Sequence, residues 1–542
     1  MATLEILNSN NNDFEQNIDI IIKNAKRHTL LNYEPTIDEM TKIYDVIFEF
    51  VKKKKLKVYG GFALNLLLLM KNKKVSIYDE DDVPDVDIYS TTPTDDIQEL
   101  CDILYKKKFE NIEAKPALHG DTFKLFVNFQ EYCDFTYVPL NIYSNIRYID
   151  IKNINERYND LKVVNPWFIT IDYFRIFCDV AGSYWRLSKQ YDRYKLLQKY
   201  YPLPKITKSL VLTENNKDIK KVIWMLYDYL SLKENILFTG LYVYNYYLYI
   251  SKYKNVNKNY QFIDIPYLEI YSANYKEDGI ELINYIENLP EEIKSHIRHE
   301  ERYPFFQFIG YSVIFYYDDK PILYMMSNSN KCLPYKKTNS LKFINGQTVK
   351  QDNFINICSF DQNILYSLIR LVIVRVEDKQ DLNDLIYKCI NGYVVFRNHY
   401  VTVNKISVIK DDSLFQSFVI PEKCIGEIIL PDREMRLQMK EKKKKGDKNF
   451  IFRYIPTENS KHLNSPFFAN SSGNAIVNKQ KLQLVQNVET EHSSEHISEP
   501  ISNHVYEHSS EQITNNNNDM HEEDLLSINS VDSDDTMESL TP

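Results

Sequence analysis

Two segments of the chain repeat one pattern, and this repeat constrains the fold more than any other feature of the sequence. Val83–Ser90 reads Val-Pro-Asp-Val-Asp-Ile-Tyr-Ser, and Ile265–Ser272 reads Ile-Pro-Tyr-Leu-Glu-Ile-Tyr-Ser. Upstream of each, a strand-like stretch runs through glycine into a helical stretch, at Tyr59–Leu67 and at Phe238–Leu248. A recurring order of elements indicates internal duplication. We therefore predict two halves of similar α+β architecture.

The elements predicted to follow each copy are also alike. In both halves a helical stretch precedes two strand-like runs: Asp95–Tyr105 then Thr122–Val138, and Glu277–Ile286 then Phe305–Met325.

Two consecutive glycines, Gly60 and Gly61, stand in the first copy between a strand-like stretch and a helix-forming run. Glycine lets the backbone turn sharply, and the free N–H groups at the start of a helix bind anions. The pair therefore predicts a seat for phosphate groups. A plain strand-to-helix turn is the alternative, because isolated glycine pairs often occur by chance.

Three carboxylates accompany these glycines. Asp85 and Asp87 are separated by one residue in a strand-like run, so their side chains point to the same face of a sheet. Asp134 lies in the second strand of a predicted hairpin, which places it beside the other two. Neighbouring carboxylates repel one another unless a cation neutralises them, and their hard oxygens suit Mg²⁺ or Mn²⁺. We predict a metal site here; taken alone, Asp134 could instead be a charge that protects an edge strand.

The order Gly-Gly, Asp-x-Asp and later Asp resembles that of the nucleotidyltransferase superfamily, which includes DNA polymerase beta. The residues around it are similar to those of poly(A) polymerase catalytic subunits from large cytoplasmic DNA viruses of the poxvirus and mimivirus kind. The specific motifs are Val58–Asn65, Asp85–Ser90, His119 with Thr122, and Tyr132–Asp134.

One feature departs from the superfamily pattern. The interval between Gly61 and Asp85 is longer than in many members. The acidic run Asp79-Glu80-Asp81-Asp82 fills part of this interval, and its role is open.

The resemblance implies a mixed α+β nucleotidyltransferase fold, internally duplicated, with a degenerate second copy. In that copy Tyr267 stands at the position of Asp85, and Leu323–Tyr324 stand near the position of the third carboxylate. The second copy is therefore expected to bind no metal and to serve as a scaffold or RNA surface.

The resemblance also implies a function, a template-independent poly(A) polymerase that adds AMP from ATP to RNA 3′ ends in mRNA polyadenylation. Asp85, Asp87 and Asp134 would bind two Mg²⁺ or Mn²⁺ ions, and Gly60 and Gly61 would hold the β- and γ-phosphates. The alternatives are another RNA nucleotidyltransferase, either tRNA nucleotidyl-adding or oligoadenylate-forming, and a catalytically silent RNA-binding subunit.

A basic stripe follows the metal-site residues. Arg186, Lys189 and Arg193 recur at spacings of three and four, which predicts one cationic face of a helix. Such a face suits the phosphates of a nucleotide or of RNA, and a solvated helix surface is the alternative. We interpret Trp185, Tyr191 and Tyr194 as packing residues rather than base-stacking platforms.

The net charge of -9 is unevenly distributed. Residues 481–542 carry fourteen acidic residues against one lysine, or -13, which leaves +4 on residues 1–480. That tail cannot bury a core and is predicted to be disordered. A basic segment precedes it and contains Lys442, Lys443, Lys444 and Lys445. These lysines suit contacts with the RNA backbone, and a solvated linker is the alternative.

The patterns divide the chain into five predicted regions. They are an N-terminal helical segment (1–50), a catalytic nucleotidyltransferase domain (51–204), a second degenerate domain (205–430), a basic linker (431–480) and a disordered acidic tail (481–542). A capping box at Thr36 to Glu39 predicts the start of an amphipathic helix in the first region.

Seven cysteines are scattered without a CxxC pair, which argues against zinc and against a secreted disulfide framework. We expect them to be reduced and mostly buried. The longest apolar run, Ala63–Met70, is too short to span a bilayer. These features predict a soluble intracellular protein, and the resemblance adds the host cytoplasm and the virion as its locations. A homodimer or a viral processivity subunit is left open as a partner.

Overall fold

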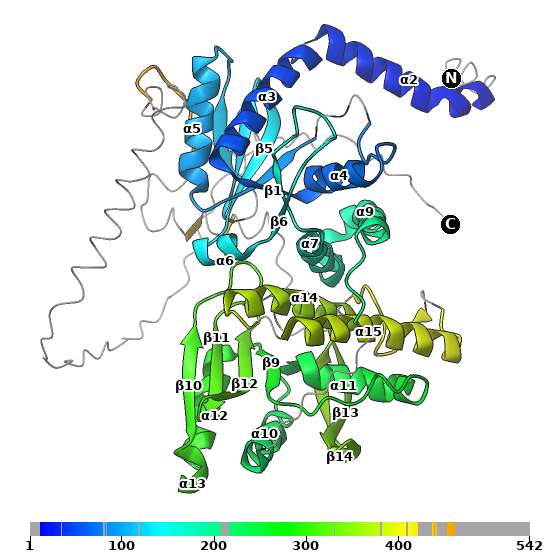
Figure 1. Cartoon of the computed structure of the whole chain (residues 1–542), viewed down its shortest axis with the longest axis vertical. Helices are drawn as coiled ribbons and strands as arrows, with labels where there is room; N and C mark the ends of the chain where they lie inside the picture. The colour runs from blue at the N-terminus through cyan, green and yellow to red at the C-terminus, as the bar shows by residue number, and fades with distance from the viewer. Residues whose placement is uncertain are drawn as a thin grey trace, which may run out of the picture. The chain divides into compact units, whose positions relative to one another are not determined.

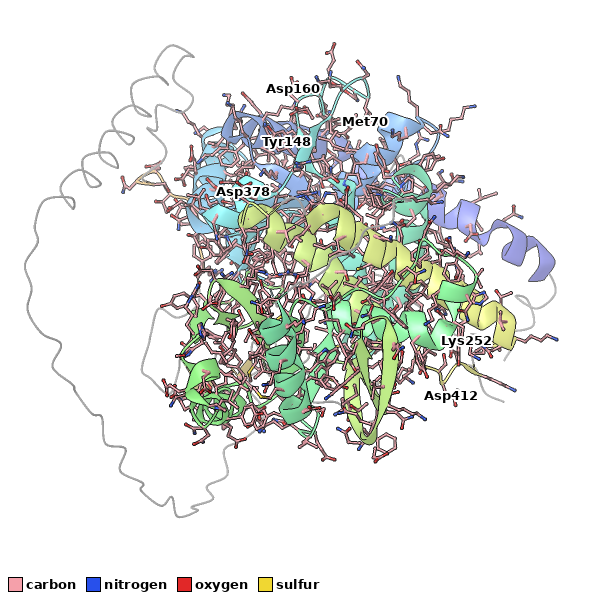
Figure 2. The ribbon with its side chains drawn as sticks, turned by 60° about the horizontal axis from the view of Figure 1, so that its bottom comes forward. Met70, Tyr148, Asp160, Lys252, Asp378 and Asp412 are labelled. Carbon is pink, nitrogen blue, oxygen red and sulfur yellow. The ribbon has the colours of Figure 1, made fainter. Side chains whose placement is uncertain are left out.

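The computed structural model describes residues 11–420, except 34, 80–81, 83, 118–119, 207–215, 330, 380–381 and 408–409, together with 426, 436–437, 440–441 and 452–460. The described residues form a mixed α+β fold with two seven-stranded sheets (Figure 1). Figure 2 shows how densely side chains fill the space between these sheets and their helices. The predicted acidic tail and Lys442 to Lys445 lie outside the described residues.

The first sheet has the strand order β3-β4-β5-β2-β1-β7-β6. Its strands are β1 (Lys57–Tyr59), β2 (Val86–Ser90), β3 (Glu113–Pro116), β4 (Thr122–Val127), β5 (Gln130–Tyr137), β6 (Tyr148–Asp150) and β7 (Lys162–Val164). β2–β5 and β1–β7 are parallel, and the other neighbouring pairs are antiparallel.

Helices of the first half begin where local sequence signals favour them. They are α2 (Asn11–Asn32), α3 (Ile37–Lys54), α4 (Gly60–Lys71), α5 (Pro93–Lys106), α6 (Leu140–Asn145), α7 (Pro166–Cys178), α8 (Val180–Ser183) and α9 (Leu187–Tyr200), with a 3₁₀ turn η1 (Tyr184–Arg186). The predicted start of α3 is confirmed, because the Thr36 hydroxyl accepts a hydrogen bond from the Glu39 N–H at 3.3 Å. The Glu39 carboxylate instead accepts a hydrogen bond from the Asn128 side chain at 2.6 Å. α3 buries its apolar side and packs on α5, which covers β4 and β5.

The second sheet repeats the first, with the order β10-β11-β12-β9-β8-β14-β13. Its strands are β8 (Ile236–Thr239), β9 (Leu268–Ser272), β10 (Ile297–Arg302), β11 (Ser312–Tyr317), β12 (Lys320–Ser327), β13 (Tyr335–Ile344) and β14 (Gln347–Cys358). Each neighbouring pair has the same parallel or antiparallel sense as its counterpart. The helices of this half are α10 (Lys217–Leu230), α11 (Gly240–Ser251), α12 (Tyr275–Glu287), α13 (Glu291–Lys294), α14 (Phe360–Val376) and α15 (Asn383–Asn404), with η2 (Tyr253–Asn255).

Side-chain hydrogen bonds repeat as well as strands. Ser90 donates to Asp96 at 2.5 Å, and Ser272 donates to Asp278 at 2.5 Å. These bonds join the second strand of each sheet to the helix that follows it. The prediction of two similar halves is confirmed, and this degree of repetition is consistent with duplicated domains.

One predicted boundary was wrong. The strand run expected from Phe305 begins only at Ser312, because Phe305 and Ile309 close a loop through an isolated bridge. Aromatic residues in that loop pack inward, as in the edge-to-face contact of Phe306 with Phe308 at 5.1 Å, and so imitate a strand in sequence.

A segment from the far end of the chain returns to the first sheet. This returning segment, residues 452–460, forms an antiparallel bridge with β3, in which Ala114 and Tyr454 exchange two N–H···O bonds of 2.9 Å. Arg453 pairs with Glu113 at 2.5 Å, and the rings of Phe452 and Phe123 meet edge-to-face at 4.9 Å. The returning segment therefore covers the edge of the first sheet.

Five of the seven cysteines are free, namely Cys101, Cys133, Cys178, Cys358 and Cys389. Cys332 is disulfide-bonded, so the expectation that all cysteines are reduced was wrong. The spacing of scattered cysteines does not encode such a pairing. No helix among the described residues is long and apolar enough to cross a membrane.

Candidate active site

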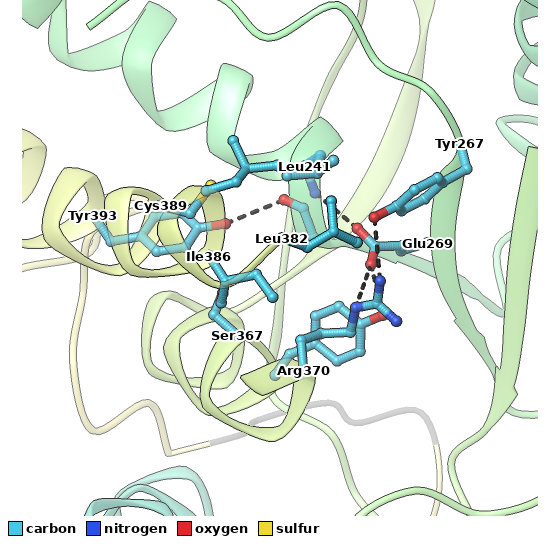
Figure 3. A pocket seen from close by; sticks show the side chains of 12 residues that line it. Leu241, Tyr267, Glu269, Ser367, Arg370, Leu382, Ile386, Cys389 and Tyr393 are labelled. Carbon is cyan, nitrogen blue, oxygen red and sulfur yellow. Dashed lines mark hydrogen bonds and ion pairs between the residues drawn. The ribbon is translucent and has the colours of Figure 1, made fainter. Parts of the chain in front are cut away.

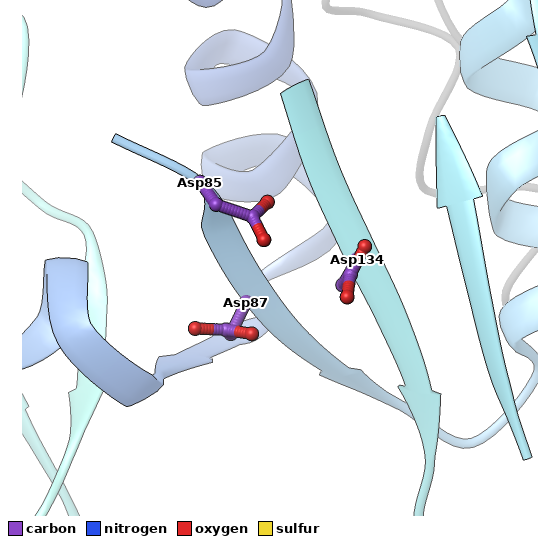
Figure 4. Close-up of side chains that lie close together, drawn as sticks. All are labelled: Asp85, Asp87 and Asp134. Atoms are coloured by element: carbon purple, nitrogen blue, oxygen red, sulfur yellow. The ribbon is translucent and has the colours of Figure 1, made fainter. Parts of the chain in front are cut away.

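Two adjacent parallel strands bring the three predicted carboxylates together (Figure 4). Asp87 lies on β2 and is in register with Asp134 on β5, while Asp85 directly precedes β2. One carboxylate oxygen from each residue lies within 4.8 Å of the others. Val86 and Cys133 alternate with these residues and are fully buried on the other face of the sheet. The register is thus fixed by the core, and it aligns the acids on one face.

The electrostatics of this cluster favour a cation. Asp134 is 5% exposed, and Asp85 and Asp87 are half-buried. Burial first, and then repulsion from Asp134, raise the pKa of Asp87 to about 8. Burial raises the pKa of Asp134 to about 6, against the opposing effect of Lys124. For Asp85, burial and the two neighbouring acids hold the pKa well above its ordinary value.

The donor set fits a divalent metal ion. Within the described part of the chain, Oδ1 of Asp85 and Oδ1 of Asp134 are buried and have no hydrogen-bond partner. Buried carboxylate oxygens are normally satisfied, so these two are oriented for a ligand. Hard oxygens in this arrangement match the preferences of Mg²⁺ and Mn²⁺. Asp85, Asp87 and Asp134 can therefore hold metal ions.

The two glycines are required by close approach at the start of α4. Gly60 has φ = 72°, and a Cβ atom there would lie 1.9 Å from Oδ2 of Asp87. A Cβ atom on Gly61 would lie 2.6 Å from the Tyr78 hydroxyl and 2.8 Å from a guanidinium nitrogen of Arg193. The N-terminus of α4 is consequently packed against both the carboxylates and an arginine, which a plain turn does not require.

The predicted basic stripe is only partly formed. Arg186 lies in η1, and only Lys189 and Arg193 belong to α9. The Asp179 side chain caps α8 by accepting a hydrogen bond from the Gly182 N–H at 3.1 Å, and η1 separates α8 from α9. Arg193 lies beside Gly61, Arg186 is half-buried, and Lys189 is exposed. Geometry therefore links Arg193 most directly to the glycine turn.

The aromatic residues of this region agree only in part with the packing interpretation. Tyr194 packs as expected, with its ring edge-to-face against Phe174 at 5.7 Å. Trp185 is 66% exposed and Tyr184 is 72% exposed. Tyr191 is 44% exposed, although its ring also meets Phe418 edge-to-face at 6.0 Å. Trp185 lies instead against its neighbour Arg186, 5.2 Å from the guanidinium.

Further charged residues belong to the site and were missed by sequence reasoning. Lys124 on β4 lies 3.3 Å from Oδ2 of Asp134 and forms a second ion pair with Glu131. Asp172 on α7 lies 3.4 Å from Arg175, and its charge raises the pKa of Asp87. The hairpin register could have revealed Lys124, since it stands opposite Asp134. No local signal pointed to Asp172, because α7 is distant in sequence.

The acidic run before Asp85 is described only in part. Asp82 forms an ion pair with Lys26 of α2 at 2.5 Å and accepts a hydrogen bond from the Asp79 N–H at 2.8 Å. Glu80 and Asp81 lie outside the described residues, as does His119.

The equivalent position in the second half contains a different cluster (Figure 3). Glu269 accepts hydrogen bonds from the Leu241 N–H at 2.9 Å and from the Tyr366 hydroxyl at 2.8 Å. The guanidinium of Arg370 lies 3.4 Å from Glu269 and donates to the Tyr267 hydroxyl at 3.1 Å. All four side chains are at least nine-tenths buried. A cavity of about 20 Å³ remains beside them.

Comparison with known proteins places these features in a family. A model described as "Poly(A) polymerase catalytic subunit" matches residues 45–183. A second family model matches residues 195–486. Its description is that of the C-terminal part of a provisionally assigned poly(A) polymerase catalytic subunit, labelled APMV.

Individual relatives agree with these models. A protein of Acanthamoeba polyphaga mimivirus, provisionally named poly(A) polymerase catalytic subunit, is 34% identical over 490 residues, which cover 84% of this chain and 80% of the relative. A protein of the same provisional name from African swine fever virus (strain Badajoz 1971 Vero-adapted) is 34% identical over 172 residues, covering 31% of this chain and 34% of the relative. The crystal structure of the Megavirus polyadenylate synthase superposes with a TM-score of 0.73 at 30% identity, covering 88% of this chain and 89% of that one.

Proposed function

The chain belongs to the poly(A) polymerase catalytic subunit family of mimivirus-like and African swine fever virus-like large DNA viruses, and from this premise we propose that it adds AMP from ATP to RNA 3′ ends without a template. The observation that carries the proposal is the convergence of Asp85, Asp87 and Asp134 within 4.8 Å beside the glycine turn. A silent subunit would have no need of three mutually repelling carboxylates that are shielded from solvent in whole or in part.

Each residue of the cluster has a role in this proposal. Asp85 and Asp87 hold both metal ions, and Asp134 completes the site. When bound, two Mg²⁺ or Mn²⁺ ions activate the RNA 3′-hydroxyl and stabilise the pyrophosphate that leaves. Because the pKa of Asp87 is raised to about 8, this residue would give up a proton near neutral pH as a metal binds.

The glycine turn and the arginine beside it bind the nucleotide. Backbone N–H groups of Gly60 and Gly61 open α4, where the helix dipole favours the β- and γ-phosphates. Arg193 lies close enough to Gly61 to contact the same phosphates, and Arg186 and Lys189 add positive charge. Catalysis then depends on positioning and charge neutralisation and needs no covalent nucleophile.

The regions of the chain follow from this assignment. Residues 51–204 form the catalytic domain, and residues 205–430 form a second nucleotidyltransferase-like domain that serves as a scaffold. The basic linker, residues 431–480, contacts RNA through Lys442 to Lys445. The protein acts on mRNA in the host cytoplasm, as a homodimer or with a viral processivity subunit.

One assay tests the proposed function. Purified protein is incubated with a primer RNA, Mg²⁺ or Mn²⁺, and each nucleoside triphosphate separately, and the products are resolved by length. We expect long extension with ATP only. Asp87→Asn should abolish it, whereas Asp150→Asn, at an exposed position on the far edge strand β6, should not.

The same assay separates the alternatives. Addition of cytidylate and adenylate to a tRNA 3′ end alone would favour a tRNA nucleotidyl-adding enzyme, and primer-free joining of ATP would favour an oligoadenylate-forming enzyme. No addition under any condition, by protein shown to be folded, would favour a silent RNA-binding subunit.

A further inference from the structure

A single row of paired residues crosses the first sheet at the level of the metal site. Tyr59 is in register with Asp87, and Asp87 with Asp134. Asp134 is in register with Lys124, and Lys124 with Lys115 on the edge strand β3. Residues paired across strands have their side chains on the same face of a sheet. Two lysines therefore continue the line of carboxylates towards the edge.

The two lysines differ in how their charge is balanced. Lys124 is half-buried between Asp134 and Glu131 and contacts both. Lys115 is exposed, and its ammonium lies 4.0 Å from the centre of the Phe126 ring. Among the described residues, Lys115 has no acidic partner within ion-pair distance. An exposed, uncompensated lysine on the face of the metal site is available to an anion.

The returning segment adds to the positive character of this edge. Glu113 lies two positions before Lys115 on β3, on the same face. Arg453 pairs with Glu113 at 2.5 Å and so neutralises the acidic charge nearest to Lys115 on that strand.

The second sheet shows that these lysines are not a requirement of the sheet itself. The corresponding row is Thr239, Glu269, Tyr324, Ile314 and Glu300. Ile314 stands where Lys124 stands, and Glu300 stands where Lys115 stands. The same architecture is thus built with an apolar residue and an acid at these two positions.

We propose that the 3′-terminal segment of the RNA leaves the metal site across β4 and β3, past the ion-paired Lys124, with a phosphate held by Lys115. Strands lie about 4.8 Å apart, so the row carries positive charge roughly 10 Å outward from Asp134. The three carboxylates repel the phosphates of RNA, so the RNA needs positively charged side chains nearby. The lysines in the same row as the acids supply this charge. This inference rests on the proposed function for the identity of the site.

The test compares RNA binding by Lys115→Glu, Lys115→Arg and Lys152→Glu in the full chain. Lys152 is equally exposed but follows β6, at the opposite edge of the first sheet, so it controls for the change in net charge. Loss of one phosphate contact lowers the slope of log affinity against log salt by about 0.7 for a single strand, which is on the order of tenfold in affinity at 50 mM salt. We expect this loss for Lys115→Glu, with little change for the other two variants.

Primers with single uncharged methylphosphonate linkages locate the contact. In the wild type, neutralising a linkage near the 3′ end should weaken binding, and in Lys115→Glu the same linkage should have no further effect. Equal behaviour of Lys115→Glu and Lys152→Glu, or coupling only at linkages far from the 3′ end, overturns the proposed path.

This result is separable from that of the proposed function. Binding is measured without ATP, and Mn²⁺ affinity measured by electron paramagnetic resonance should be unchanged in Lys115→Glu. If the wild type adds no nucleotide but the linkage coupling is present, the RNA path stands and the proposed reaction fails. If the wild type adds AMP and the coupling is missing, the reaction stands and the path fails.

Discussion

The two halves of this protein place an acidic residue at the same point of the same sheet and balance its charge in opposite ways. Asp87 lies among other carboxylates, two of whose oxygens have no partner within the described residues. Glu269 is met by an N–H group, a hydroxyl and the guanidinium of Arg370. The first site can therefore take a cation from solution, whereas the second is balanced by the guanidinium of Arg370. The comparison separates what the fold requires from what the chemistry requires.

What the fold requires is the contact between the acid and the glycine turn. Gly240 has φ = 66°, and a Cβ atom there would lie 1.7 Å from Glu269, just as one on Gly60 would meet Asp87. The turn and its acid are thus present in both halves, with or without neighbouring carboxylates. The fold does not require Asp85 and Asp134, because Tyr267 and Tyr324 stand at their positions in the second half and the strand pairing is the same.

The largest difference between the halves should appear in catalysis. Asp87→Asn is expected to lower nucleotide addition on the order of a thousandfold or more, because it removes a ligand shared by both metals. Glu269→Gln should retain most activity per folded molecule. Extension rates normalised to the folded fraction measure this, and a loss in Glu269→Gln approaching that of Asp87→Asn would show that the second half carries chemistry.

Matched glycine substitutions should separate activity from stability. Gly60→Ala forces a side chain against Asp87 in a left-handed conformation, so we expect loss of most activity together with weakened Mn²⁺ binding. Gly240→Ala meets the same strain of about 1–2 kcal/mol plus a displaced Glu269, and should lower the free energy of unfolding while sparing Mn²⁺ binding. Calorimetric metal titration and urea unfolding of both variants provide the measurements. Equal Mn²⁺ affinities in the two variants would contradict the assignment of the metal to the first half.

Replacing Arg370 should lower the free energy of unfolding more than replacing any single residue of the metal site. Arg370→Met leaves Glu269 buried without its cation, which typically costs about 3–5 kcal/mol. The double variant Glu269→Gln with Arg370→Met removes both charges and should recover much of that loss. Urea unfolding of the single and double variants gives the coupling, and additive effects would mean that the pair does not act as a unit.

Proton binding should be strong at the metal-site carboxylates of the metal-free protein. The pKa of Asp87 is about 8 in the folded chain, against an ordinary value of 3.8, and that of Asp134 is about 6. The folded protein thus keeps protons that the unfolded chain has released, so the free energy of unfolding falls as the pH rises from about 4 to 8. Mg²⁺ should counteract this fall and release protons on binding. Asp87→Asn should flatten the pH dependence; an unchanged profile would exclude Asp87 as its source.

The smallest expected effect concerns the sheet edges. The edge strand β3 is covered by the returning segment, while its counterpart β10 is protected by exposed charged residues such as Arg298 and Glu300. A chain ending after Ser460 should keep full stability and catalysis. A chain ending after Phe450 loses two backbone hydrogen bonds and the Phe452 contact, about 2 kcal/mol in all. Thermal unfolding of both truncations tests this, and equal melting temperatures would show that the contact contributes nothing.

The parts of the site that depend on local sequence patterns could be predicted from the sequence. The strand alternation around Asp85 and Asp87, and the hairpin that carries Asp134, fixed the face and the neighbour of each carboxylate. The repeat of Val83–Ser90 predicted the second sheet, whose full strand order the structure then supplied. These features are periodic in sequence because each follows from the pleat of a strand.

The parts that were missed depend on distant packing. Asp172 approaches Asp87 only because α7 packs beside α4, and Arg370 reaches Glu269 from a helix about a hundred residues later. The basic stripe was expected on one helix, but the 3₁₀ turn η1 precedes α9, so Arg186 lies outside the helix that carries Lys189 and Arg193. Such long-range contacts produce no periodic pattern in the sequence.

The returning segment can pair with β3 only late in the synthesis of the chain. Glu113 and its partner Arg453 are separated by 340 positions, so β3 leaves the ribosome long before the residues that cover it. Domains fold as the chain emerges, N-terminal parts first, and an open strand edge invites pairing with other chains. During synthesis, the outer edge of β3 is therefore unpaired until residues 452–460 have been made. A prematurely terminated product would carry the whole metal site and remain prone to aggregation.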